Sequence, residues 1–125
     1  MASELDLDFF GELLMTRVRD KAISEWDRIM DGRAKGITAK VVKKALENFS
    51  EEQKKTVGWL LPKVVDSTIH HLLWTFEQEL VVDIVVKKES GTVNSIRDLS
   101  DGLSGELYTQ DGWIVRFSKQ RYEEF

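Results

Sequence analysis

Apolar residues recur every three or four positions along two long stretches of the chain, which is the spacing of one face of an amphipathic helix. The first stretch predicts a helix over about residues 6–30, with a buried row made by Phe10, Leu14, Val18, Ala22, Trp26 and Ile29. Asp31-Gly32 predicts its end, since glycine accepts the left-handed backbone that follows many helices. The second stretch predicts a helix over about residues 51–77, with a buried row made by Val57, Leu61, Val65, Ile69, Leu72 and Phe76.

A shorter helix is predicted between these two, starting after Thr38 as the N-cap. Ser50 and Gln53 have the spacing of a capping box at the start of the second long helix. Pro62 lies inside that helix and predicts a kink or a break, because proline cannot donate the helical hydrogen bond. At ~1.5 Å per residue each long helix is roughly 40 Å long, so the two can share a core only by lying antiparallel.

The pattern changes after Glu79, where β-branched residues and turn signals become frequent. Residues 80–86 predict a strand and residues 93–99 a weaker one. Residues 105–109 and 113–118 flank Asp111-Gly112, a strong hairpin signal. The fold class predicted for residues 1–125 is therefore a single α+β domain. It has an N-terminal antiparallel layer of three helices, the third kinked, and then a small C-terminal antiparallel β-meander of three to four strands.

Composition fits a globular protein, with 42% hydrophobic and 32% charged residues in a chain of 125. The chain has no cysteine, which excludes disulfides and thiolate metal sites and is compatible with a reducing compartment. The first eight residues carry Glu4, Asp6 and Asp8 rather than the positive charge of a secretory signal. No apolar run is long enough to span a bilayer. We therefore expect a cytoplasmic protein that does not enter a membrane.

The net charge of −4 is unevenly distributed along the chain. Residues 1–62 hold eleven acids and eleven bases, whereas residues 63–125 hold eleven acids and seven bases. Such a skew steers a charged partner, although it is also common on surfaces without a specific role. The acids proposed to meet a basic protein are Asp98, Asp101, Glu106 and Asp111. The basic stretch 33–44 contains no aromatic residue for base stacking, so nucleic-acid binding is not favoured.

Two groups of polar residues are candidates for chemistry. Asp66, His70 and Glu77 share one face of the predicted second long helix and are ligand types for a divalent metal. The simpler interpretation is that Asp66 bonds His70 at the edge of the core. Asp101 and Glu106 are a possible general acid and base, but turn formation explains the composition of that segment. No nucleophile elbow, phosphate-binding loop or other cofactor motif is present, and no cofactor is expected.

Trp59 and Trp74 fall off the buried row of the second long helix. If they are exposed, they are suited to anchor a protein partner or a second subunit, since tryptophan is enriched at binding hot spots. If the β region covers them, they belong to the core. The sequence leaves both interpretations open.

The segment from Asp101 to Tyr108, followed by Asp111-Gly112-Trp113-Ile114, resembles small bacterial domains of uncharacterised function. In size, acidity and lack of cysteine the chain is similar to some immunity proteins of toxin–immunity systems. The charge skew and the absence of any catalytic motif favour a non-enzymatic protein-binding module, for which the resemblance suggests an immunity-like inhibitor of a basic partner. The resemblance assigns no functional residue. The alternatives are a small metal- or carboxylate-dependent enzyme and a homo-oligomeric structural protein.

Overall fold

One long helical rod forms the first quarter of the protein. The computed structural model describes the backbone of residues 2–121 and the side chains from residue 5 onward. Helix α1 (Ala2–Leu14), a π-helical turn η1 (Met15–Arg19) and helix α2 (Asp20–Met30) follow one another in helical conformation. The rod ends before Gly32, whose φ of 75° is the left-handed conformation expected from the sequence.

The π-helical turn changes which residues face the interior. A π-turn accommodates one extra residue, so the buried row shifts by one position after Leu14. Val18, predicted to be buried, is 46% exposed, while Arg19 is 0% exposed. The buried row continues through Met15, Arg19 and Ile23. The predicted helix is confirmed, but its predicted buried face is wrong in the middle.

Helices α3 (Ile37–Ala45) and α4 (Glu51–Gln78) follow. The N-cap of α3 is Gly36 and Thr38 lies within its first turn, so the predicted start at Thr38 is wrong. The capping box is confirmed: the Ser50 hydroxyl accepts from the Gln53 backbone N–H at 3.1 Å, and Gln53 Oε1 accepts from the Ser50 N–H at 2.8 Å. Helix α4 passes through Pro62 as one helix of 28 residues, so the predicted break does not occur.

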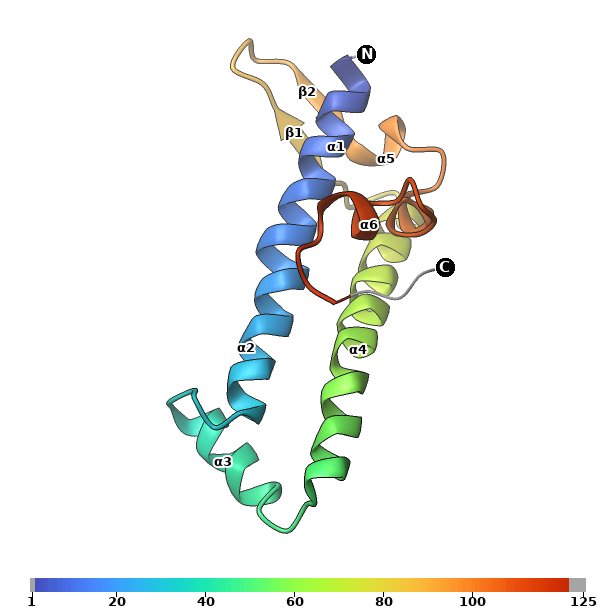
Figure 1. The fold of residues 1–125 in the computed structure, drawn as a ribbon. Helices are drawn as coiled ribbons and strands as arrows, with labels where there is room; N and C mark the ends of the chain where they lie inside the picture. The colour runs from blue at the N-terminus through green and yellow to red at the C-terminus, as the bar shows by residue number, and fades with distance from the viewer. Residues whose placement is uncertain (1, 122–125) are drawn as a thin grey trace.

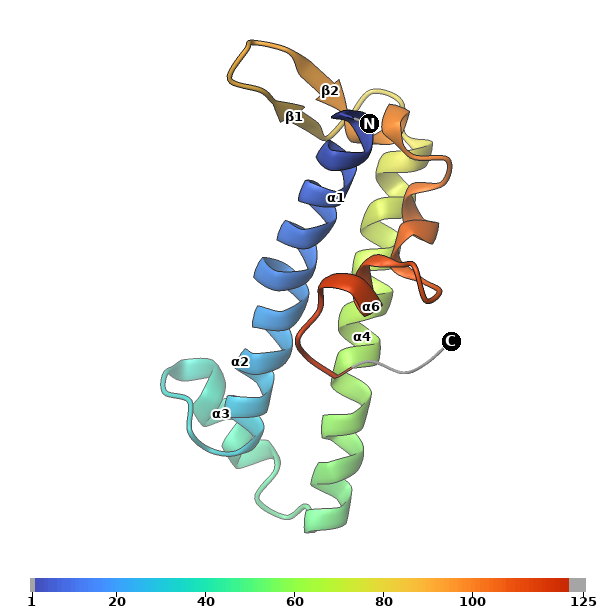
Figure 2. The same cartoon turned by 45° about the horizontal axis from the view of Figure 1, so that its top comes forward.

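The rod and α4 lie side by side and antiparallel, as their lengths require (Figure 1). Helix α3 packs against α2 at the end of the molecule where the chain turns back. The C-terminal third returns along the opposite half, close to α1 and the second half of α4 (Figure 2).

The C-terminal third contains little sheet. Strands β1 (Val85–Lys87) and β2 (Val93–Ser95) pair antiparallel, with Val86 opposite Asn94. Three short helical segments follow: α5 (Ile96–Leu99), η2 (Leu103–Leu107) and α6 (Trp113–Phe117). The structure is thus α+β in its coarse description, with two strands within residues 2–121. The strands predicted over 105–109 and 113–118 are wrong. Trp113 and Ile114 are both buried and Phe117 partly so, which is helical spacing rather than alternation.

The core occupies the half of the molecule that contains the C-terminal third. It consists of buried apolar side chains from the rod, the second half of α4 and the segments after β2: Leu7, Leu14, Met15, Ile69, Leu73, Ile96, Leu103, Leu107, Trp113 and Ile114. Trp113 is 0% exposed and packs edge-on against Phe10, with ring centroids 5.8 Å apart. Gly11 makes room for this indole, because a Cβ at that position would lie 2.5 Å from the ring.

Two polar side chains attach the hairpin and α5 to the helices. Asp6, buried in α1, accepts from the Lys88 ammonium and from Asn94 Nδ2, and these bonds lower its pKa. Arg97 Nη1 donates to the backbone oxygens of Phe76, Glu79 and Val82, at 2.7, 3.0 and 3.0 Å. Arg97 therefore satisfies the Phe76 carbonyl in the last turn of α4 and two carbonyls of the segment that follows the helix.

Candidate functional site

An acidic patch forms where the segment 100–112 meets the first helix. Glu106 and Asp111 lie near Arg116 of α6, Asp101 lies near Glu106, and Asp8 of α1 forms an ion pair with the Arg116 guanidinium at 2.8 Å. We refer to Asp8, Asp101, Glu106 and Asp111 as the acidic patch. Its members come from opposite ends of the chain, and three of them, Asp8, Glu106 and Asp111, lie around one cation.

Local bonds and close packing fix the shape of this segment. The Ser100 hydroxyl donates to Glu106 Oε1 at 3.1 Å and accepts from the Gly102 N–H at 3.1 Å. Leu103 and Leu107 of η2 are buried against α4. Position 112 requires glycine, since a Cβ there would lie 2.0 Å from the Tyr108 backbone oxygen. The acids are thus presented from a fixed backbone rather than from a long loop.

Partial burial and neighbouring carboxylates together raise the pKa of Glu106. Partial burial raises its pKa most, and the negative charges of Asp101 and Asp8 raise it further. The Ser100 hydrogen bond and Arg116 act in the opposite direction. The patch is therefore electrostatically unfavourable in its own right, and a cation placed on it relieves that repulsion.

The structure brings together three of the four acids predicted for protein binding. Asp98 is exposed in the first turn of α5, and it is not among the charges that act on Glu106 or Arg116. Asp8, which belongs to the patch, was not predicted because it lies nearly one hundred positions earlier in the sequence. The hydrophobic pattern carried no signal for this pairing of α1 with α6.

Each member of the predicted metal site has its own protein partner. Asp66 binds Arg19, His70 Nδ1 lies 2.9 Å from the Tyr108 hydroxyl, and Glu77 Oε1 accepts from the Ser104 N–H at 3.2 Å. The predicted bond between Asp66 and His70 is replaced by these contacts. Among the residues that the structure describes, no three His, Asp or Glu side chains are grouped so as to hold a metal ion. The geometry does not favour the metal-dependent enzyme.

Both candidate anchor tryptophans of α4 are exposed. Trp59 is 57% exposed and Trp74 is 48% exposed. The Lys63 ammonium lies 4.2 Å from the Trp59 ring centroid, a cation–π contact that holds the ring along the helix surface. The C-terminal segments cover a different side of α4, so these side chains are not core residues.

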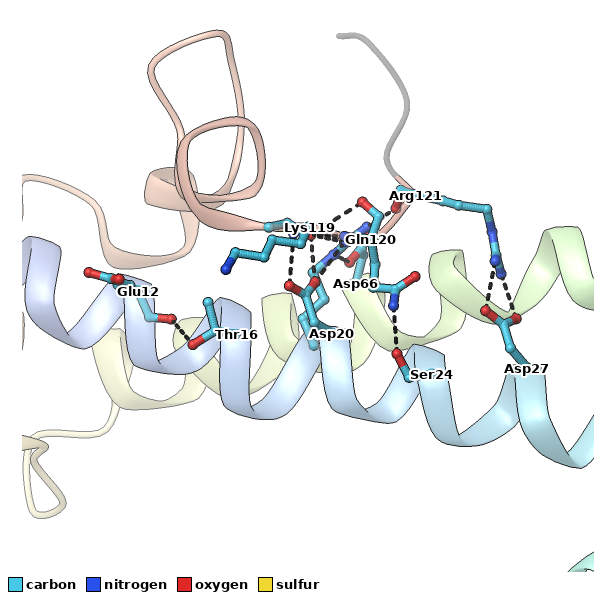
Figure 3. A network of polar contacts seen from close by, with 11 residues as sticks. Glu12, Thr16, Asp20, Ser24, Asp27, Asp66, Lys119, Gln120 and Arg121 are labelled. Carbon is cyan, nitrogen blue, oxygen red and sulfur yellow. Dashed lines mark hydrogen bonds and ion pairs between the residues drawn. The ribbon is translucent and has the colours of Figure 1, made fainter. Parts of the chain in front are cut away.

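A buried arginine network, which the sequence did not predict, holds residues 118–121 against the helices. Arg19 Nε donates to Asp66 Oδ1 at 2.6 Å, and Nη1 donates to the Ser118 hydroxyl at 2.7 Å. The Ser118 hydroxyl donates in turn to Asp20 Oδ1 at 2.6 Å. Figure 3 shows the neighbouring residues: Asp20, Ser24 and Asp27 line α2 and face Lys119, Gln120 and Arg121. Arg19 is fully engaged, which identifies it as a structural clamp.

The spacing of Met15, Arg19 and Ile23 was the one available signal for this clamp. Four-residue intervals place all three on one helical face, and an arginine buried between two apolar residues requires an anionic partner. Arg19 lies in the buried row because of the π-helical turn, and this turn has no signature in the sequence.

These observations define a small, mostly helical α+β chain whose distinctive features lie on its surface. Within residues 2–121 no helix combines the length and the apolarity needed to cross a bilayer. The chain matches no protein family, no curated protein and no solved structure in comparisons with each.

Proposed function

We propose that this protein is a non-enzymatic protein-binding module whose acidic patch meets a basic protein. The observation that carries the proposal is the convergence of Asp8, Glu106 and Asp111 around Arg116, with Asp101 beside Glu106. A basic partner gains attraction from the patch and also relieves the repulsion among its carboxylates, which adds to the larger effect of partial burial in raising the pKa of Glu106. Such complementarity accelerates association and selects against acidic proteins.

The resemblance to immunity proteins suggests which class of protein the partner belongs to. A basic enzyme domain that is inhibited by binding, as in toxin–immunity pairs, has the charge that the patch requires. Inhibition then follows from covering a cationic substrate-binding surface, without chemistry by this chain. On this proposal the chain meets its partner in the cytoplasm, the location expected from the sequence.

The proposal is tested by comparing captured proteins rather than by capture alone. The tagged chain and a patch variant, Asp101→Asn/Glu106→Gln/Asp111→Asn, are used in parallel on native lysate, with quantitative mass spectrometry. The matched control neutralises three exposed acids elsewhere, Glu25→Gln, Glu47→Gln and Glu89→Gln, so that net charge changes equally.

We expect a basic protein that the wild type and the control retain and that the patch variant loses. The Asp98→Asn substitution should leave capture unchanged, since Asp98 lies outside the patch. The proposal fails if the patch variant captures the same proteins in the same amounts as the control.

A further inference from the structure

Helix α3 has one exposed side that is both basic and apolar. The opposite side packs towards α2, with Ala39 buried and Val42 and the C-cap residue Leu46 partly buried. Lys35, in the loop before the helix, and Lys43 lie at the edge of the exposed side. The exposed side itself consists of four residues at helical spacing, which together with Lys35 and Lys43 we call the α3 face: Ile37, Lys40, Val41 and Lys44.

The α3 face is strongly basic although the whole chain is acidic. Residues 32–46 contain five bases and no acid, in a chain whose net charge is −4. Among the residues that the structure describes, none of the four lysines in this segment forms an ion pair. Two acids at the same end of the molecule, Asp31 and Glu51, are paired with Arg33 and Lys54 instead, at 2.9 and 3.5 Å. The four lysines are therefore available to an anionic partner.

The acidic part of the molecule is too far away to cancel this charge. Figure 1 shows α3 at one end and the C-terminal third, which carries most of the acidic patch, towards the other. Between Asp8 and Met30 the rod rises by about 33 Å, at ~1.5 Å for each of its residues. The screening length at physiological ionic strength is only about 8 Å. An anionic surface at α3 therefore meets the lysines with little repulsion from the patch.

From these features we propose that the α3 face binds the surface of a membrane that contains anionic phospholipids. Such a surface suits both kinds of side chain, since ammonium groups pair with lipid phosphates while apolar side chains enter the headgroup boundary. Ile37 is 83% exposed and Val41 63%, so both apolar side chains can make this contact. A nucleic acid offers no such apolar layer, and residues 33–44 contain no aromatic side chain for base stacking.

A hollow beside the α3 face has room for a phosphate headgroup. Its volume is about 380 Å³, and it lies between the loop before α3 and the helix itself. Lys35, Lys40 and Lys43 line it, the rest of its wall is apolar residues and glycines, and none of the lining residues is acidic. Hydrogen bonds between ammonium and phosphate groups are charge-assisted and correspondingly strong. The hollow therefore favours a phosphate-bearing lipid over an apolar ligand.

This membrane contact concerns a surface separate from the acidic patch and goes beyond the proposed function. It is a contact at the headgroup level and requires no helix that crosses the bilayer. A molecule bound through α3 has its C-terminal third at the far end (Figure 1), so the acidic patch stays open to a protein in solution. The two surfaces can therefore be tested independently.

The test is co-sedimentation of the full chain with lipid vesicles at about 0.1 M salt. One set of vesicles is phosphatidylcholine alone, and the other contains roughly one third phosphatidylglycerol. The wild type should sediment with the anionic vesicles and remain in solution with the neutral ones. Raising the salt to about 0.5 M should release it, because the contacts made by the lysines are then screened.

Two variants separate the contribution of charge from that of the apolar side chains. Lys40→Gln/Lys43→Gln/Lys44→Gln should weaken binding to the anionic vesicles roughly hundredfold, since each lysine near such a surface contributes about fivefold. Ile37→Ser/Val41→Ser keeps the charge and should weaken binding about tenfold, because less apolar surface leaves water. All five positions are exposed, so folding should be unchanged, which circular dichroism checks.

Matched controls remove the same kinds of side chain elsewhere. Lys21→Gln/Lys87→Gln/Lys119→Gln changes the net charge equally, and all three lysines are exposed. Leu60→Ser/Val64→Ser removes two exposed apolar side chains from α4. Both controls should bind the anionic vesicles as the wild type does.

The proposal is overturned if the wild type stays in solution with the anionic vesicles at about 0.1 M salt, which would leave the α3 face to an acidic protein or a nucleic acid. It is overturned equally if the lysine control loses as much binding as the variant of the α3 lysines, because net charge alone would then explain the binding. Unchanged binding by Ile37→Ser/Val41→Ser would also overturn it, since these two side chains are the reason for inferring a lipid surface.

Discussion

Replacing Gly11 by alanine sets two physical effects against each other. In the interior of an exposed helix, glycine to alanine stabilises the protein by about 1 kcal/mol, because alanine has the higher helix propensity. At position 11 the added Cβ would lie 2.5–2.7 Å from three indole atoms of Trp113. Carbon atoms in contact prefer about 3.5–4.0 Å, so the ring must move by about 1 Å. It has little room to move, since it is fully buried and packs against Phe10.

Overpacking of this kind costs about 1–3 kcal/mol, and here it is set against the gain in propensity. We expect Gly11→Ala to lower the free energy of unfolding by up to about 2 kcal/mol after that gain is included. Gly58→Ala is the control within α4, because a Cβ there meets nothing within 4 Å. It should raise the free energy of unfolding by up to about 1 kcal/mol.

Urea denaturation followed by circular dichroism measures both changes, provided that the dependence on urea stays constant among the variants. The two variants should move the midpoint in opposite directions. If Gly11→Ala is as stable as Gly58→Ala, Trp113 does not pack closely on α1, and α6 does not lie against α1 in this way.

Three further predictions concern polar side chains. Arg97→Ala should lower the free energy of unfolding by about 2 kcal/mol in urea denaturation, because three carbonyls lose a charged donor, and Arg97→Lys should recover only part of it. Asp66→Asn should destabilise the protein by about 3 kcal/mol, more than Arg19→Met, since it removes the carboxylate that binds the buried guanidinium through two nitrogens and leaves only Asp20, at 3.7 Å, as an anionic partner; equal effects would argue against the clamp. Glu106→Gln should stabilise the protein at pH 7. The pKa of Glu106 in the folded state is raised above its ordinary value of 4.5. The free energy of unfolding therefore falls as the pH rises from 4.5 to that raised pKa. The stabilisation by glutamine should vanish when denaturation is measured below pH 4.5.

The long helices were predictable because each has strong, local signals. The capping box of Ser50 and Gln53 and the stop at Gly32 depend on neighbouring residues alone. The C-terminal third was predicted poorly because its signals are weak and short. Asp111-Gly112 does form a turn, but Trp113 and Ile114 both seek the same core, and burying adjacent residues selects a helical turn over a strand.

The candidate site was predictable only where its residues are close in sequence. Asp101, Glu106 and Asp111 share one segment, whereas Asp8 joins them through tertiary packing. Exposure of Trp59 and Trp74 was likewise left open, because it depends on which side of α4 the C-terminal segments cover. The shift from Val18 to Arg19 arises from a single π-turn, which propensity and periodicity do not reveal.

The central claim, that the acidic patch binds a basic protein, is tested most directly by a dissociation constant. Once the protein captured by the wild type and lost by the patch variant is identified, calorimetry measures its binding at low and at high salt. We predict that Asp101→Asn/Glu106→Gln/Asp111→Asn weakens binding about tenfold or more at low salt, and that added salt weakens the wild type towards the variant. Equal affinities of wild type and variant at low salt would contradict the account.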